Sequence, residues 1–120
     1  MKDKAEGCKT EEALEVIMGK WKLTILFYLI FHGTQRFSEL RNLMPEVTQK
    51  MLTNQLRELE EQDIIRRVVY AQVPPKVEYS ITEHGRTLQS VLGIMNEWGA
   101  VHAEHMQSKK PNPPLSAVKR

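Results

Sequence analysis

Apolar positions recur at helical spacing through the first half of the chain. They predict a helix that begins at Thr10, which would cap it, with two acids in the first turn that suit the positive end of the helix dipole. A second helix is expected over residues 22–31, and it is so apolar that it should lie in the core. After a short extended piece at residues 36–37, Ser38 would cap a small helix that ends before Pro45.

The next predicted helix follows a tight turn and has two distinct faces. Thr48 would cap it, and Val47 with Leu52 fits a hydrophobic staple across its first turn. The helix should reach residue 61 or 62, where the periodic pattern ends. Its inward residues would be Leu52, Leu56 and Leu59, with Met51 beside them.

A β-hairpin and a long helix complete the pattern. Residues 64–70 and 77–81 are rich in β-branched residues and are separated by a polar, Pro-bearing loop over 71–76, which is typical of a hairpin. Thr82 would then cap one long last helix. Its apolar positions recur at steps of three and four: Leu88, Val91, Leu92, Met95, Trp98 and Val101.

The order of these elements predicts the architecture. A helix, a tight turn, a helix and a hairpin form a winged helix-turn-helix, so the fold class is mainly α with a small β-hairpin and with extra N- and C-terminal dimerisation helices. At roughly 150 residues per domain, 120 residues make about one domain. We expect a flexible segment over 1–9, the winged domain with its dimerisation helices over 10–107, and a disordered tail over 108–120.

Composition limits the possible partners and the cellular compartment of the protein. The chain has 17 Lys and Arg against 15 Asp and Glu, and this net charge of +2 permits nucleic-acid binding without requiring it. Its one cysteine rules out an intramolecular disulfide and a Cys-rich zinc site. There is no signal-peptide pattern, and the longest apolar stretch is too short to span a bilayer. We therefore expect a cytoplasmic protein with no membrane partner.

The helix after Thr48 carries side chains that suit a DNA major groove. In a helix-turn-helix the first helix crosses the DNA backbone, and the N-terminal half of the second enters the groove. Acids gather at the far end of this helix, as expected if only its first half meets DNA. The outward residues that could contact bases and phosphates are Gln49, Lys50, Thr53, Asn54 and Arg57.

The hairpin adds basic residues to this surface. Arg66, Arg67 and Lys76 could contact phosphates or the minor groove of double-stranded DNA. Winged helix pairs also serve as protein–protein interaction modules without specific DNA binding, so this alternative stays open. A steep salt dependence of DNA affinity would separate the two, because phosphate contacts release counterions.

Several short motifs occur in a characteristic order along the chain. They are Met18-Gly19-Lys20-Trp21, Arg36-Phe37-Ser38-Glu39-Leu40, Thr48-Gln49-Lys50-Met51-Leu52, Leu56-Arg57-Glu58-Leu59-Glu60, and a run from Pro75-Lys76-Val77-Glu78-Tyr79 to Gly85. Together they closely resemble the HxlR family, small bacterial winged-helix transcription regulators related to the MarR group. The resemblance covers about residues 8–98. It implies a homodimeric regulator, with the helix after Thr48 as the recognition helix and residues 71–76 as the wing tip.

The last helix independently predicts a dimer, because it carries more apolar surface than a small winged domain can cover. The expected interface residues are Leu14, Ile17 and Met18 of the first helix and Met95, Trp98 and Val101 of the last. Packing of Trp98 within its own chain is the alternative. A symmetric dimer would place two recognition helices about 34 Å apart and would read an inverted-repeat operator.

Cys8 is a candidate redox sensor. It lies just before the first helix and beside Lys9, and a helix N-terminus and nearby cations both favour the thiolate. In the family that the chain resembles, a cysteine at this place serves some members as a sensor of oxidants or electrophiles. Those sensors often have Pro next, where this chain has Lys9, and an inert thiol is the alternative. Any disulfide would have to join two subunits or a small thiol.

The sequence gives little support for metal binding or catalysis. His102 and His105 could offer two metal ligands, but histidines at a helix end more often pack or face solvent, so no metal is expected. There is no Gly-rich phosphate loop, no Ser/His/Asp order and no paired-carboxylate pocket, so we expect neither enzymatic activity nor a cofactor. No large pocket for a small-molecule effector is evident, and the identity of any effector stays unknown.

Overall fold

The computed structural model describes residues 9–109. The chain divides into two compact units, with the boundary between Arg86 and Thr87. Within the described range the first unit holds five helices and three strands, and the second is one long helix, α6 (Leu88–Lys109). No helix in residues 9–109 is both long enough and apolar enough to cross a bilayer.

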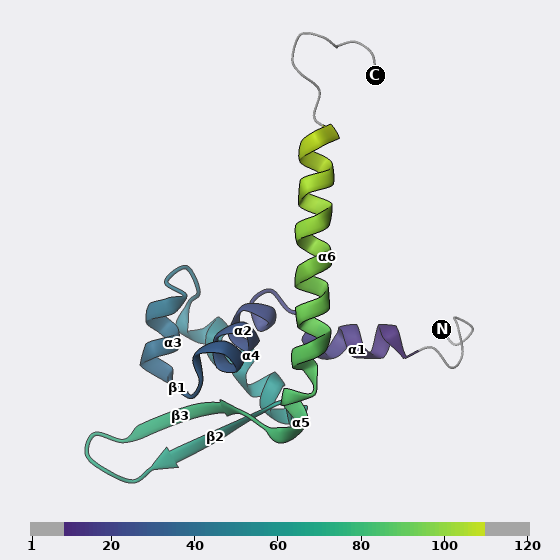
Figure 1. Cartoon of the computed structure of the whole chain (residues 1–120). Coiled ribbons are helices and arrows are strands. Elements are labelled where there is room, and N and C mark those ends of the chain that lie inside the picture. The colour runs from purple at the N-terminus through teal and green to yellow at the C-terminus, as the bar shows by residue number, and fades with distance from the viewer. Residues whose placement is uncertain (1–8, 110–120) are drawn as a thin grey trace. The chain divides into compact units, whose positions relative to one another are not determined.

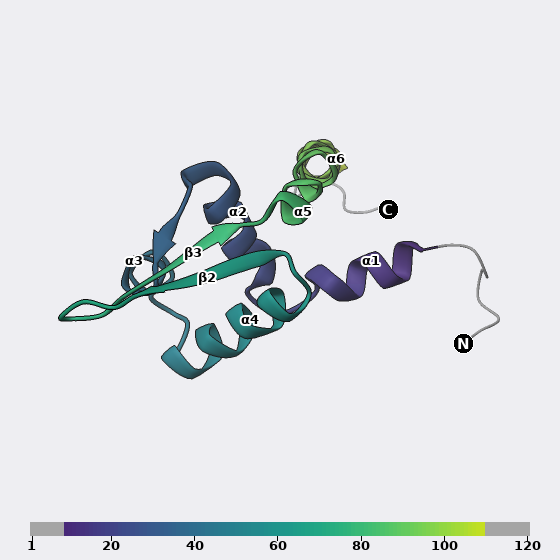
Figure 2. The same cartoon turned by 90° about the horizontal axis from the view of Figure 1, so that it is seen from below.

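The first unit, called the winged unit below, is a winged helix-turn-helix. Its helices are α1 (Thr10–Ile17), α2 (Lys22–His32), α3 (Phe37–Leu43), α4 (Gln49–Glu61) and α5 (Glu83–Arg86), and its strands are β1 (Gln35–Arg36), β2 (Ile65–Tyr70) and β3 (Lys76–Ile81). α2 contacts α4 and β3, and α4 contacts β2. The closed end of the β2–β3 hairpin projects beyond α3 and α4 in both views (Figure 1, Figure 2). The predicted fold class is confirmed.

The core lies between α2, α4 and the sheet. The predicted inward residues of α4 are all buried, together with three from α2 and three from the sheet: Leu52, Leu56, Leu59, Ile25, Leu26, Leu29, Ile65, Tyr79 and Ile81. α2 is less interior than its composition predicts. Leu23, Phe27 and Phe31 are about half exposed, because the helix turns only one face towards α4 and β3.

The start of α4 follows the predicted capping pattern. Thr48 is the N-cap, and its Oγ1 accepts a hydrogen bond from the backbone N–H of Met51 at 3.1 Å. Val47 before the cap and Leu52 in the first turn are both buried, as a hydrophobic staple requires. The turn and the entry angle of α4 are thus specified by the local sequence.

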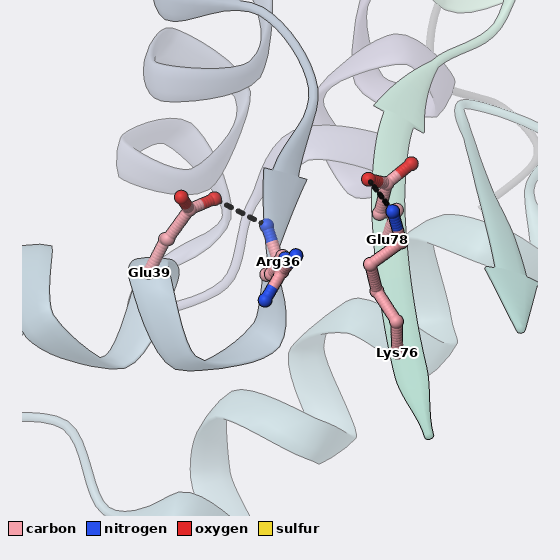
Figure 3. Close-up of polar contacts among 4 residues, drawn as sticks. All are labelled: Arg36, Glu39, Lys76 and Glu78. Carbon is pink, nitrogen blue, oxygen red and sulfur yellow. Dashed lines mark hydrogen bonds and ion pairs between the residues drawn. The ribbon is translucent and has the colours of Figure 1, made fainter. Parts of the chain in front are cut away.

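Two other predicted caps are wrong. α3 begins at Phe37 rather than after Ser38, and Arg36 holds the N-cap position. The Glu39 carboxylate accepts a hydrogen bond from the Arg36 backbone N–H at 2.7 Å, which is the contact that the N3 acid makes with the N-cap residue in a capping box (Figure 3). Thr10 is likewise the first residue of α1 and not its N-cap.

The sheet has three antiparallel strands in the order β1-β3-β2. The β2–β3 hairpin pairs Ile65 with Ile81 and closes with Tyr70 opposite Lys76. The extended piece predicted at residues 36–37 lies one residue earlier: Gln35 and Arg36 form the two-residue strand β1, in which Gln35 pairs with Tyr79, and Phe37 already begins α3. This third strand ties the start of α3 to the hairpin.

The predicted last helix is interrupted. Thr82 caps α5, where its Oγ1 accepts from the Gly85 N–H at 2.8 Å and donates to the Asp63 carbonyl at 2.7 Å, with the Ile64 carbonyl also within reach at 3.0 Å. Gly85 packs directly on the Ile64 carbonyl, and a Cβ there would collide with it. These contacts bind α5 to the start of β2, and the helix breaks at Thr87 before α6 begins.

α6 is a helix of 22 residues with no buried side chain. Leu88 and Leu92 are half-buried, and the other large apolar residues are exposed: Val91, Ile94, Met95, Trp98, Val101 and Met106. The Trp98 ring stacks on His102 with centroids 4.9 Å apart and planes at 8°. The helix therefore presents a continuous apolar and aromatic surface.

Candidate nucleic-acid interface

The helix-turn-helix is formed by α3, the turn over residues 44–48, and α4. Met44 and Val47 are buried in the turn, and the Val47 N–H donates to the Met44 carbonyl at 3.1 Å. Arg41 of α3 donates from Nη1 to Oε1 of Gln49 at 3.3 Å. This contact, which the sequence did not predict, joins the two helices and orients the first side chain of α4.

The polar residues predicted for DNA contact lie on the side of α4 away from its buried leucines. Gln49, Lys50 and Arg57 are exposed, and Thr53 and Asn54 are half-buried. On β2, Arg66 and Arg67 are both exposed. The structure thus places these predicted residues where they are accessible.

A hollow lies between α4 and the hairpin, and it divides the predicted residues into two groups. It has a cavity volume of about 460 Å³ and is lined by Phe37, Gln49, Thr53, Arg57, Glu60, Arg67, Val77 and Tyr79. Four of the predicted DNA-contact residues share this hollow: Gln49, Thr53, Arg57 and Arg67. The other four, Lys50, Asn54, Arg66 and Lys76, do not line it. Sequence spacing could not reveal the hollow, because the distance between α4 and the sheet is set by tertiary packing.

Tyr79 forms part of the floor of this hollow. Its side chain is buried, and this burial raises the pKa of the hydroxyl above its usual value, while the neighbouring Arg67 charge and a side-chain hydrogen bond to Arg67 oppose the rise. Glu60 also raises this pKa and Arg57 lowers it, which places both charges within electrostatic reach of the phenol. The hydroxyl is therefore neutral at physiological pH, between two guanidinium groups and one carboxylate.

The wing is less free to contact DNA than its composition suggests. The Nζ of Lys76 lies 3.5 Å from Oε2 of Glu78 (Figure 3). The same Nζ lies 4.6 Å from the centroid of the Tyr70 ring. Its charge is therefore partly compensated within the hairpin. At the tip, Val73 is 98% exposed.

An ion pair between a buried lysine and an exposed glutamate, which the sequence did not predict, joins α4 to α2. Lys22 of α2 is buried, and its Nζ lies 2.7 Å from Oε1 of Glu58. Glu58 is one of the acids at the far end of α4, so part of that cluster has a structural partner. A lysine in a helix this apolar is the one sequence signal, but the sequence does not show which acid meets it.

The same region explains Gly19 of the Met18-Gly19-Lys20-Trp21 motif. A Cβ at Gly19 would lie 2.5 Å from Oε1 of Gln55 and 2.9 Å from Cδ of Lys22. Gln55 is buried on α4, and its Oε1 has no hydrogen-bond partner among residues 9–109. The glycine therefore lets the α1–α2 connection pass close to the recognition-helix candidate.

The residues predicted for a dimer interface are distributed unevenly. On α1, Ile17 lies in the core of its own chain and Leu14 is half-buried, whereas Met18, predicted in this helix, is exposed just after its end. On α6, Met95, Trp98 and Val101 are all exposed, with Trp98 at 63%. Cys8 lies outside the described residues. In residues 9–109 no group of three or more His, Cys, Asp or Glu side chains is arranged to hold a metal ion.

Comparison with known proteins gives a consistent picture. Residues 16–107 match the family described as HxlR-like helix-turn-helix. The chain is 53% identical over 107 residues to the HTH-type transcriptional regulator YybR of Bacillus subtilis (strain 168), and the match covers 89% of this chain and 85% of that protein. It is also similar to the redox regulator HypR in its reduced form, with a TM-score of 0.78, 50% identity, and coverage of 84% of this chain and 99% of that one. The oxidised form of HypR gives a TM-score of 0.71 at 53% identity, covering 78% and 96% of the two chains.

Proposed function

The chain belongs to the HxlR-like helix-turn-helix family of transcriptional regulators, and from this premise we propose that it acts as a homodimer that reads an inverted-repeat operator. It is a regulator of transcription and not an enzyme. The observation that carries the proposal is the placement of α4. Its start is fixed by the Thr48 cap and the buried turn, its leucines face the core, and its polar side chains are accessible beside the hairpin.

The proposed DNA contacts follow from that placement. Gln49, Lys50, Thr53 and Asn54 lie in the first half of α4 and would read base edges in the major groove. Side chains from the second half of α4 and from the hairpin would hold phosphates or enter the minor groove: Arg57, Arg66, Arg67 and Lys76. Among these, Lys76 would contribute least, because Glu78 already compensates its charge.

Dimerisation is proposed through α6 and the exposed part of α1. Exposed apolar residues in such number on one helix favour burial against another protein surface. Met95, Trp98 and Val101 of α6 and Leu14 and Met18 of α1 would form this interface. A two-fold axis would present two copies of α4 about 34 Å apart, which matches half-sites one turn of DNA apart.

We further propose that the regulator works in the cytoplasm and responds to oxidants or electrophiles through Cys8. HypR, named a redox regulator, has been solved in a reduced and an oxidised form, and both resemble this chain. Cys8 is the one cysteine of the chain. Under an oxidant, two Cys8 thiols from two subunits would lose two electrons and two protons and form an intersubunit disulfide; an electrophile would instead alkylate one thiolate.

A fluorescence-anisotropy titration tests both parts. The reduced protein is titrated into a labelled duplex of the DNA that flanks its own gene, with a scrambled duplex as control, at several salt concentrations and before and after thiol alkylation. We expect preference for the native duplex, steep salt dependence and loss of affinity on alkylation. The Cys8→Ser variant should bind DNA and ignore the alkylating agent. Unchanged affinity after alkylation would overturn the sensor role alone, and absence of DNA binding under all conditions would overturn the operator proposal.

A further inference from the structure

A side-chain hydrogen bond connects the two helices of the helix-turn-helix. Nη1 of Arg41, in the last turn of α3, donates to Oε1 of Gln49, the first residue of α4, at 3.3 Å. Because a guanidinium group has donors and no acceptor, its partner in the glutamine amide must be the oxygen. The contact therefore determines which end of the amide turns towards α3, and it leaves the Nε2 donor for another partner.

Both partners of this contact are attached to well-fixed backbone. The Met44 N–H donates to the carbonyl of Leu40 at 3.0 Å and to that of Arg41 at 3.3 Å, which fixes the end of α3. The Thr48 cap fixes the start of α4. Arg41 is half-buried whereas Gln49 is exposed, so the arginine is the anchored partner and the glutamine is the one that DNA can reach.

We infer that Arg41 is a positioning residue that determines which base Gln49 reads. With Oε1 turned to Arg41, the amide presents its Nε2 donor to the major groove and selects guanine over adenine. This inference rests on the proposed function, because it requires that the first half of α4 enters the groove. It adds a residue of α3, which is not among the predicted DNA contacts, to the selection of the operator sequence.

The edges of the two purines explain this choice. Both present N7 in the major groove as an acceptor for Nε2, but they differ at the neighbouring atom, since O6 of guanine is an acceptor and N6 of adenine is a donor. A glutamine that is free to turn pairs with adenine by accepting from N6 and donating to N7. The hydrogen bond from Arg41 takes Oε1 of Gln49 away from that pair.

The charge of Arg41 adds a repulsive element against adenine. Oε1 of Gln49 has a second lone pair, so the hydrogen bond alone does not close it to a base. The amino hydrogens of adenine, which carry partial positive charge, would have to approach Oε1 beside the positive guanidinium group. Specificity commonly depends on such an unfavourable contact with the wrong partner as well as on a favourable contact with the right one.

A phosphate contact is the alternative role for an arginine at this place. Phosphate contacts fix the position of a protein on DNA but carry no sequence information. Loss of such a contact weakens binding to all duplexes alike and lowers the salt dependence by about one counterion. Loss of a positioning residue instead changes the base preference at one position, so the two roles predict different measurements.

The first part of the test is made on the full-length protein without DNA. NMR relaxation of the side-chain amide groups compares Gln49 with Gln89, an exposed glutamine near the start of α6. We expect the Gln49 amide to move less than the Gln89 amide on the picosecond-to-nanosecond timescale, and to become as mobile in Arg41→Met. The backbone spectrum also reports whether each variant is folded. Equal mobility of the two amides in the unaltered chain would overturn the hold by Arg41.

The second part measures base preference by selection from a pool of random duplexes, followed by sequencing. For the unaltered chain we expect guanine at one position of each half-site, and Gln49→Ala should lose that preference. Arg41→Met should lower the ratio of guanine to adenine there by roughly fivefold or more, with the other positions unchanged. In the double variant the loss of Arg41 should have no further effect, because the arginine acts through the glutamine. Arg86→Met, on an exposed arginine of α5, removes the same charge and is the control.

Three results of the selection would overturn the role of Arg41 alone. One is a uniform loss of affinity in Arg41→Met with unchanged base preferences, which would indicate a phosphate contact. Another is a further change of base preference in the double variant, because Arg41 would then contact a base itself. The third is adenine or cytosine at the position that Gln49 reads in the unaltered chain. A chain that enriches no sequence at all would overturn the operator proposal and the base choice together.

Discussion

The winged unit and α6 differ in how far they bury their apolar side chains. The winged unit buries apolar residues from α2, α4 and the sheet against one another, and it pairs even its buried charge, Lys22, with Glu58 of the same unit. It still leaves apolar side chains exposed on the outer face of α2 and along the hairpin. α6 buries none of its residues, and the ring contacts of Trp98 and His102 run along its own surface. The winged unit thus forms an apolar core from its own residues, whereas the large apolar side chains of α6 stay at the surface of the helix.

The largest effect is expected for a truncation in the apolar core of the winged unit. Leu56→Ala removes a fully buried side chain at the centre of α4 and leaves a cavity. We expect the free energy of unfolding to fall by about 2–5 kcal/mol, measured by urea denaturation at fixed protein concentration. Val101→Ala, a truncation on α6, is the control, and at protein concentrations low enough for both variants to be monomeric it should cost far less, because Val101 is exposed in the single chain. Equal losses for the two variants would contradict the contrast between the regions.

The next prediction concerns the surface of α6. Trp98→Ala should weaken the proposed dimer by about 2 kcal/mol, or roughly 30-fold in Kd, because large aromatic residues dominate interfaces when they become buried. Analytical ultracentrifugation over a concentration series measures this change. Gln107→Ala lies on an exposed part of the same helix and should leave the Kd unchanged. An unaltered Kd for Trp98→Ala would mean that α6 associates through another face.

Local features of the fold could be predicted from the sequence, whereas features that depend on distant contacts could not. The Thr48 cap, the end of α4 at Glu61 and the hairpin strands follow from neighbouring residues, and they were predicted to within about one residue. The pairing of β1 with β3 and the break at Thr87 were missed. Both depend on contacts between distant segments, such as Gln35 with Tyr79 and Gly85 with the Ile64 carbonyl.

The candidate site shows the same difference between local and tertiary features. The accessible face of α4 was predictable because a period of 3.6 residues separates it from the buried leucines. The hollow, the compensation of Lys76 by Glu78 and the contact of Arg41 with Gln49 were not predicted. The hollow and the contact of Arg41 with Gln49 need the orientation of α4 relative to a second element, which no local pattern contains. Lys76 and Glu78, in contrast, lie two residues apart on the same face of β3, so their pairing has a local signal that was overlooked.

A third prediction tests the buried charge. Glu58→Gln leaves the buried Lys22 ammonium without its anion, whereas Lys22→Met leaves Glu58, which is half exposed, free to be hydrated. We expect Glu58→Gln to lower the free energy of unfolding by about 1–3 kcal/mol, and Lys22→Met to lower it by less. The double variant should recover part of the loss in Glu58→Gln. Urea denaturation of all three measures the asymmetry, and a larger loss in Lys22→Met would show that the lysine stem contributes more than its charge.

The smallest effect is expected at the wing, where the ion pair between Lys76 and Glu78 competes with the proposed phosphate contact of Lys76. Glu78→Gln removes the carboxylate beside Lys76 and leaves the lysine free to meet a phosphate. Exposed ion pairs contribute about 0.2–1 kcal/mol, so DNA affinity should rise by less than about sixfold, for native and scrambled duplexes alike. The salt dependence should steepen at the same time, because one more counterion is released. Glu15→Gln, on α1, changes the net charge equally and serves as the control in the anisotropy titration. A gain confined to the native duplex would mean that the wing reads bases, and equal gains in both variants would mean that only the net charge matters.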